Sequence, residues 1–536
     1  MLVGTQSNMQ PLRNKTMDKH RYNNGQNRRP MHMVARALTP LVLTLAACSS
    51  GGSSDSALLS PTTTPIALVV NQDDTTLTTV RLDGKGSPVI STLSLGPTQS
   101  DAIGGTAFSL GEWIFVTNSV TNRVATIDPI GARTPILEDF LEVNGVYKIG
   151  QRPTRIYRDP VDKEVLWTMN EGGPSTGIDM VSHCLSGGST SILHNSHILA
   201  GGTKPHITKT VCLSGTGEHF IEFSRPTAAA PGLIEVAFIS SKTTGLISVL
   251  PADPTAGTAR WNEVLRLDLC DSSKEQSLGH PMCDSGFTAY QTPNHSSPTG
   301  MFWSPATGKI YSYLSGYGSV VEIDPAALAV VRTVDITLPI PNTTVFHSVG
   351  ITPDGQFLLL VGEDLISDPA KVIGKFSVVD LGAAVLSITP LPIPELDNLR
   401  PAFFQFTPDG KRLYLLQSNK ISDLAFGAQA DNLKLDRLLV FDPSSLPSIL
   451  EFVAEVPLPA GKMHGMDLWI TGPQGAGSAK GIVVTNATPG AKGSVSLIDA
   501  TSNTITATIP VGRTPKQVTV YYFGLAASDN QATPTW

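Results

Sequence analysis

The chain has 536 residues, of which 41% are hydrophobic and 15% are charged, and its formal net charge is −7. The 48 Gly and 40 Pro residues are typical of an all-β protein rich in turns. Because an acidic chain without a basic stripe binds nucleic acid poorly, we expect no nucleic-acid partner.

The N-terminal segment predicts export. Basic residues such as Arg28 and Arg29 precede an apolar run, residues 38–47, that is too short to cross a bilayer as a permanent helix. The run ends at Cys48 and resembles the bacterial lipobox, which implies a signal peptide over 1–47 and an acylated Cys48 that anchors the protein to a membrane. Residues 48–63 are rich in Ser and Gly and predict a flexible tether. By the sorting rule of Gram-negative lipoproteins, Ser49 implies the outer membrane. Whether the protein lies on the periplasmic or the outer face is left open.

A segment of about fifty residues recurs after residue 100, which is the mark of a propeller or a solenoid. Each copy begins with a short extended stretch, often Pro plus one residue. Two apolar runs joined by a turn follow, then a third run that ends at an Asp, and then an alternating fourth run. The copies begin at Ala102, Thr154, His206, Thr299, His347, Ala402, His464 and Lys516.

The turn residues support this division. Thr352–Gly355 and Thr407–Gly410 each place Pro early and Gly late, which predicts hairpin turns. The Asp that ends each third run, for example Asp324, is expected to accept hydrogen bonds from the backbone of the next turn.

Four strands per copy make one propeller blade, so the sequence predicts an all-β propeller over residues 64–523, followed by a tail over 524–536. Residues 64–96 supply three strands without an opening strand, and residues 516–522 supply an opening strand alone. Joined, they form one blade that closes the ring and leaves no free sheet edges. The prediction is eight blades, or seven if the degenerate third copy is miscounted.

Two copies carry a motif that is typical of one kind of repeat protein. Phe115–Asn118 is followed by Asn122–Asp128, and Val483–Asn486 is followed by Gly493–Asp499. These copies resemble the repeats of the YVTN family of bacterial β-propellers. The resemblance extends over roughly residues 64 to 523, is strong only in these two copies, and implies the propeller fold.

Four cysteines besides Cys48 predict disulfides in an exported protein. The simplest pairing joins Cys184 to Cys212 and Cys270 to Cys283, although three pairings are open. Cys270 and Cys283 lie in an insertion at about 252–296, where Asp268, Asp271 and Asp284 also cluster. A stapled, projecting loop of this kind is a candidate recognition element.

Three histidines, His206, His347 and His464, stand at the start of opening strands in the third, fifth and seventh copies. Since opening strands line the middle of a propeller, these imidazoles predict a shared Zn or Cu site. The competing interpretation is that each one hydrogen-bonds to a neighbouring blade. Cationic residues at or near matching places predict a site for a small anionic ligand, or else a solvated rim. These residues are Arg155, Lys204, Arg400 and Lys516.

The sequence contains no His-Glu-x-x-His or Cys-x-x-Cys-His motif, which makes an enzyme of those kinds the weaker expectation. We therefore expect an outer-membrane lipoprotein that binds or scaffolds another envelope protein or a small ligand. The alternatives are a metal-binding or redox protein using the three histidines, and a lactonase-like hydrolase. Handling of haem d1 is a further analogy, based on blade number alone.

Overall fold

The structure is a computed structural model, and it describes most of the chain after residue 64. The described residues are 65–84, 87–96, 102–108, 111–128, 136–141, 149–162, 164–194, 206–228, 230–280, 283, 294–336, 344–364, 373–391, 393, 401–417, 436–459, 465–470, 478–488 and 490–522. The expected signal peptide, Cys48 and the tether lie outside these residues. Among the described residues, no helix is long and apolar enough to span a membrane.

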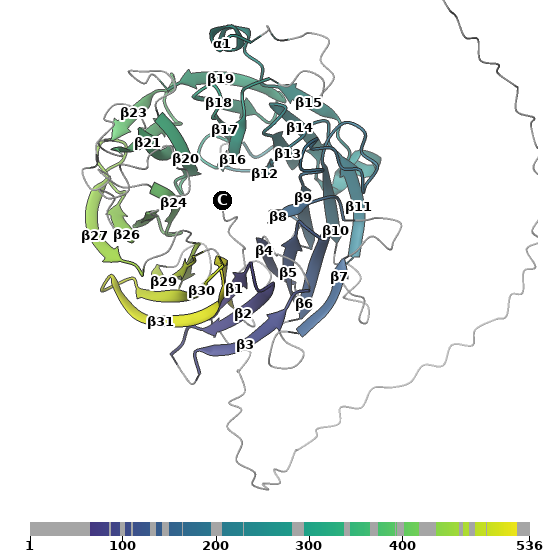
Figure 1. The fold of residues 1–536 in the computed structure, drawn as a ribbon. Coiled ribbons are helices and arrows are strands. Elements are labelled where there is room, and N and C mark those ends of the chain that lie inside the picture. Colours follow the sequence, from purple (N-terminus) through teal and green to yellow (C-terminus); the bar gives the residue numbers. More distant parts are fainter. Residues whose placement is uncertain are drawn as a thin grey trace, which may run out of the picture. The chain divides into compact units, whose positions relative to one another are not determined.

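The strands form eight antiparallel sheets of four strands each, arranged around a common middle (Figure 1). The first four sheets contain β1 (Pro65–Asn71), β2 (Thr76–Arg81), β3 (Val89–Ser94) and β32 (Pro515–Tyr522); β4 (Ala102–Phe108), β5 (Gly111–Asn118), β6 (Arg123–Asp128) and β7 (Ile136–Leu141); β8 (Pro153–Arg158), β9 (Val165–Asn170), β10 (Ser189–His194) and β11 (His206–Cys212); and β12 (His219–Ser224), β13 (Val236–Ser241), β14 (Leu246–Pro251) and β15 (Leu265–Asp268).

The other four sheets follow in chain order. They contain β16 (Pro298–Ser304), β17 (Lys309–Leu314), β18 (Ser319–Asp324) and β19 (Ala329–Asp335); β20 (Thr344–Ile351), β21 (Phe357–Asp364), β22 (Ile373–Asp380) and β23 (Ile388–Leu391); β24 (Pro401–Phe406), β25 (Leu413–Gln417), β26 (Arg437–Asp442) and β27 (Glu451–Pro457); and β28 (Met466–Ile470), β29 (Ala479–Asn486), β30 (Lys492–Asp499) and β31 (Thr504–Arg513). Two short helices, η2 (Pro254–Ala259) and α1 (Ser272–Ser277), flank β15.

The two ends of the propeller share one sheet. Strand β32 pairs antiparallel with β1, with Val518 opposite Val69 and Val520 opposite Ala67. The prediction that the N-terminal runs and the last opening strand form one composite blade is therefore confirmed. This pairing covers the edge of β1 that would otherwise be open, and β32 becomes the end strand of the sheet.

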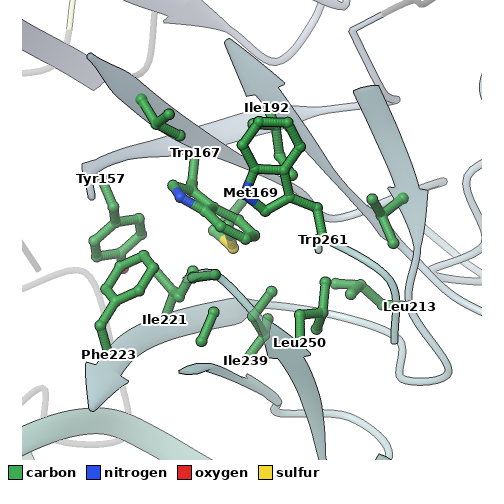
Figure 2. Packing of buried hydrophobic residues seen from close by; sticks show 14 residues of the cluster. Tyr157, Trp167, Met169, Ile192, Leu213, Ile221, Phe223, Ile239, Leu250 and Trp261 are labelled. Carbon is green, nitrogen blue, oxygen red and sulfur yellow. The ribbon is translucent and has the colours of Figure 1, made fainter. Parts of the chain in front are cut away.

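Apolar packing connects every neighbouring pair of sheets. Each of eight buried clusters draws its residues from two adjacent sheets, and together they pass around the whole ring. Figure 2 shows the cluster between the sheets β8–β11 and β12–β15, where the Trp167 and Phe223 rings meet edge to face with centroids 5.5 Å apart. A closed sequence of such interfaces is what a propeller requires, and the all-β propeller prediction is confirmed.

An Asn at the end of the second strand has the same structural role in two blades, and one of the two, Asn486, belongs to the repeated motif. Asn170 ends β9, is fully buried, and donates from Nδ2 to the hydroxyls of Ser189 and Ser191 on β10, both at 2.9 Å. Asn486 makes the same pair of bonds on β30, to Ser494 at 3.1 Å and Ser496 at 2.9 Å. In these two blades, an Asn at the end of the second strand therefore joins the second and third strands through a buried amide.

The predicted turns form as expected. The Asp499 carboxylate accepts from the backbone N–H groups of Thr501 (2.9 Å) and Ser502 (2.7 Å) and so fixes the turn into β31. Gly355 has φ of +73°, the conformation that the Thr352–Gly355 turn requires. These local bonds help to set the register of the hairpins that they connect.

The third copy differs from the prediction. Strand β11, which begins at His206, is the outermost strand of the sheet β11-β10-β9-β8, and the next sheet opens with β12. Likewise β15 lies inside the expected insertion at 252–296 but serves as the fourth strand of its sheet. The extra chain of this copy is therefore divided between the connection before β15 and the segment after it.

Candidate functional site

The three histidines expected to share a metal do not occupy equivalent places. His206 is exposed at the start of β11, at the outer edge of its blade, so the prediction that it opens an inner strand is wrong. His347 lies in the opening strand β20, but its side chain is outside the described part, as is all of His464. Within the described part, no group of three or more His, Cys, Asp or Glu side chains could hold a metal ion.

The inner strands β8 and β12 carry an ionic network at the seam between the second and third internal blades. Arg155 of β8 reaches across the seam, pairs with Glu218 and lies over the Phe220 ring, with its guanidinium carbon 4.4 Å from the ring centroid. Its Nη1 also lies 3.9 Å from the Glu171 carboxylate. Lys242 adds a second cation 2.9 Å from Glu218. Both cations are therefore bound to carboxylates of the same network.

The electrostatics of Glu218 show how strong this pairing is. Burial alone would raise the pKa of its carboxyl, but Arg155 and Lys242 outweigh burial and lower the pKa to about 2. Since the Arg155 side chain is only 16% exposed and already faces two carboxylates, it does not present a free charge to an anion. Arg155 is therefore not available to the expected site for an anionic ligand. Lys204 and Arg400 lie outside the described residues, and Lys516 lies on β32.

His219 occupies the inner position that the sequence analysis assigned to His206. It opens β12 and is fully buried, and its Nδ1 is 3.1 Å from the Ser240 carbonyl, to which it donates. Burial lowers the pKa of this imidazole to about 4, so it is neutral at ordinary pH. The sequence signal was available, because Glu218-His219-Phe220 begins an apolar run, but this opening lacks the Pro that marks other copies.

A pair of buried carboxyls lies at the same seam. Asp159, after β8, and Glu235, before β13, both accept from the Val161 backbone N–H, at 3.1 and 3.3 Å. Burial, followed by the neighbouring Asp159 carboxyl, raises the pKa of Glu235 to about 9. Two carboxylates in this position cannot both be ionised cheaply, so the pair holds a proton at neutral pH. Sequence spacing gave no sign of this contact.

Both predicted disulfides are present: Cys184 pairs with Cys212, and Cys270 pairs with Cys283. The second one closes the segment that contains α1, and Figure 1 shows α1 outside the sheets at the rim of the ring. We call residues 269–283 with 294 and 295 the stapled segment. Asp271 caps α1 by accepting from the Ser273 and Lys274 backbone N–H groups. Asp268 accepts from the Asn294 amide at 2.8 Å, and Asp284 lies outside the described residues.

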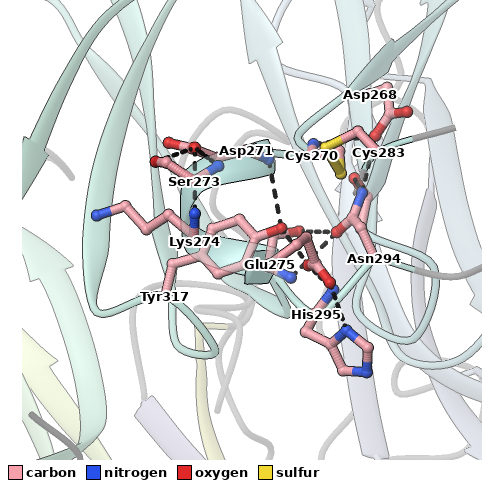
Figure 3. Close-up of a disulfide and its surroundings, with 12 residues drawn as sticks. Asp268, Cys270, Asp271, Ser273, Lys274, Glu275, Cys283, Asn294, His295 and Tyr317 are labelled. Carbon is pink, nitrogen blue, oxygen red and sulfur yellow. Dashed lines mark hydrogen bonds and ion pairs between the residues drawn. A yellow bond between two sulfur atoms is a disulfide. The ribbon is translucent and has the colours of Figure 1, made fainter. Parts of the chain in front are cut away.

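Glu275 is the centre of the stapled segment (Figure 3). Its buried carboxylate accepts from the Tyr317 hydroxyl at 2.5 Å and from the His295 backbone N–H at 2.7 Å. It also accepts from the His295 ring at Nδ1, at 2.8 Å. Burial would raise the pKa of Glu275, but these donors hold it below its ordinary value, so the carboxylate is ionised. A short helix without a core of its own is thereby fixed to the blade that carries Tyr317.

Comparison with known proteins adds no family. No protein-family model matches the sequence, and no curated protein matches it either.

Solved structures resemble the fold at low sequence identity. The dihydro-haem d1 dehydrogenase NirN in complex with DHE is 12% identical, with 86% of this chain and 75% of that chain covered and a TM-score of 0.49. Apo AztD from Citrobacter koseri is 15% identical, covers 86% and 98%, and has a TM-score of 0.47. Hydrazine synthase from Kuenenia stuttgartiensis is 16% identical, covers 74% and 94%, and has a TM-score of 0.41. No activity is carried over from these proteins.

Proposed function

We propose that this protein is an exported, lipid-anchored β-propeller that binds another protein of the cell envelope, with the stapled segment as its recognition element. The observation that carries the proposal is the Glu275 network, which holds a helix outside the sheets with a disulfide and three hydrogen bonds. The four strands of each sheet are complete without the segment, although Leu269 at its start packs into a core cluster. An ordered projection of this kind is suited to recognition.

Two features support export. The four described cysteines form two disulfides, and disulfides persist in oxidising compartments. The Leu-Ala-Ala-Cys sequence that ends at Cys48 supplies the acceptor for a lipid. The proposed location is the outer membrane, where the tether over 48–63 gives the propeller reach toward a partner.

A protein partner is favoured over a small anion because the described cations near the inner strands are already paired with carboxylates. Arg155 and Lys242 near the inner strands are already paired with Glu218. At the rim, in contrast, His295 has 44% of its side chain exposed although its Nδ1 is held by Glu275. The group best placed to meet a partner is therefore on the outside of the ring.

The test is the size of the complex in detergent-solubilised envelopes from the native host, measured by native electrophoresis of the full-length chain. We expect a species larger than the monomer, and we expect its loss in the Cys270→Ser/Cys283→Ser double variant. The matched control, Cys184→Ser/Cys212→Ser, removes the other disulfide and should keep the complex as long as protease resistance shows a folded propeller. A wild-type chain that runs only as a monomer, or a complex that survives loss of the Cys270–Cys283 bond, contradicts the proposal.

A further inference from the structure

We propose that His280 and His295 form a binding site for one divalent transition-metal ion of the imidazole-preferring kind, such as Cu²⁺ or Zn²⁺. The site lies on the rim and shares no residue with the three histidines considered above. The proposal concerns the metal alone and does not require a protein partner.

The end of α1 places the first imidazole. The His280 backbone N–H donates to the Glu275 carbonyl at 2.9 Å, and the Gly279 N–H donates to the Gln276 carbonyl at 3.0 Å. Gly279 has φ of +78°, and these two bonds with a left-handed Gly form a Schellman motif. In that motif the residue after the Gly comes back against the last turn of the helix, so His280 is brought to the side of Glu275.

Glu275 orients the second imidazole. The Glu275 carboxylate lies 2.8 Å from the His295 Nδ1 and favours the tautomer in which Nδ1 carries the proton and donates to it. The lone pair of the ring is then on Nε2, in a side chain that is 44% exposed. A carboxylate that fixes the tautomer of a histidine from behind is the arrangement found behind metal-bound imidazoles.

The two imidazoles are in direct contact. Their rings stack with centroids 3.5 Å apart and planes 9° apart. A shared ion needs both nitrogens about 2.0–2.1 Å away, so the His280 ring has to turn out of the stack on its side-chain torsions while His295 stays held by Glu275. Because the helix end fixes the backbone of His280, only the side-chain torsions of His280 have to change for its ring to reach the ion.

The surrounding charges favour a cation. Glu275 contributes a buried negative charge directly behind His295, and the nearby Lys274 ammonium is paired with Asp335. Two imidazoles are fewer ligands than a closed structural site has, and no third His, Cys, Asp or Glu joins them among the described residues. Water completes the coordination, which suits an exchangeable ion. Imidazole ligands favour Cu and Zn, and Cu²⁺ stands highest in the stability order.

The test is a Cu²⁺ titration of the purified full-length chain, followed by electron paramagnetic resonance and by metal content after gel filtration. We expect one Cu²⁺ with two coordinated nitrogens that is lost in His280→Ala and in His295→Ala. Glu275→Gln keeps both imidazoles but weakens their orientation, and we expect its affinity to fall about 10–100-fold. The control is His206→Ala, an exposed histidine on β11, which should bind as the wild type does.

The outcomes are decisive. Loss of one equivalent in both histidine variants, with unchanged circular dichroism, supports the site. A titration identical in wild type, His280→Ala and His295→Ala overturns it, and so does a loss in the His206→Ala control of the same size as in the two variants. Since His280→Ala removes no hydrogen bond of the Glu275 carboxylate, that variant keeps the test valid even if His295→Ala does not fold.

Discussion

The seam between β8 and β12 and the stapled segment at the rim use charged residues in opposite ways. At the seam, Arg155 and Lys242 are both bound to Glu218, and the nearby His219 is buried and neutral. At the rim, Glu275 is also buried, and its carboxylate holds Nδ1 of His295, whose side chain is 44% exposed to solvent. In the seam network, the charged groups pair with one another and hold two blades together. In the Glu275 network, the buried carboxylate orients a histidine that remains partly exposed.

This difference indicates that a functional group in this propeller can lie at the rim and not only on the inner strands. Inner strands are the usual place to expect a site, and the sequence analysis placed both its metal ligands and its cations there. In the structure, the charged residues Arg155, Glu171 and Glu218 of the β8–β12 seam are paired with one another. His219 donates from Nδ1 to the Ser240 carbonyl, while its buried Nε2 has no hydrogen-bond partner among the described residues. A side chain whose bonds are already satisfied within the fold contributes to stability first.

The first expected effect comes from breaking the seam. Arg155→Ala leaves Glu218 without its main cation and leaves Glu171 with Arg152 alone, in a mostly buried place, and we expect the free energy of unfolding to fall by about 2 to 4 kcal/mol. Urea denaturation measures this loss. Arg513→Ala, which removes an exposed pair with Asp74, is the matched control and should show no resolvable change. Equal effects of the two variants would mean that the seam network is only a surface feature.

The second effect is a pH dependence that belongs to the seam alone. The folded pKa of Glu235 is about 9, well above the ordinary value of 4.5, so the folded chain keeps a proton that the unfolded chain releases in this window. This contribution to stability is complete below pH 4.5 and is lost as the pH rises toward 9, by about 1.4 kcal/mol per pH unit. Glu235→Gln cannot ionise and should flatten this loss.

The measurement for this prediction is urea denaturation of wild type and Glu235→Gln at several pH values between 5 and about 9. We expect the two stability curves to converge at the acidic end and the variant to become the more stable protein at the alkaline end. Parallel curves across the whole range would show that Asp159 and Glu235 do not share a proton.

The repeat pattern predicted the fold well because its signals are local. The Thr352–Gly355 turn, the Asp499 turn and the composite blade all depend on residues close in sequence or at the ends of a periodic series. The one misplaced copy has a physical reason. The sequence Pro205-His206 resembles an opening stretch, but His206 begins a fourth strand, whereas the true opening at His219 has no Pro.

The candidate sites were only partly predictable. The pairing of Cys270 with Cys283 followed from their shared place in an insertion, and it is confirmed. The contacts of Glu275 with His295 and Tyr317 join residues 20 and 42 positions apart in the chain, across a disulfide-closed segment and a different blade. No motif or period encodes such a contact, because it depends on how α1 is packed against the sheet.

The central claim is that a partner meets the rim and not the inner strands, and site-specific photo-crosslinking in the native envelope tests it most directly. A photoreactive residue is placed in the full-length chain at Gln276, which is exposed on α1, or at Lys242 near the inner seam. The account predicts a discrete adduct with another envelope protein from position 276 and none from position 242. An adduct from position 242 alone would contradict it.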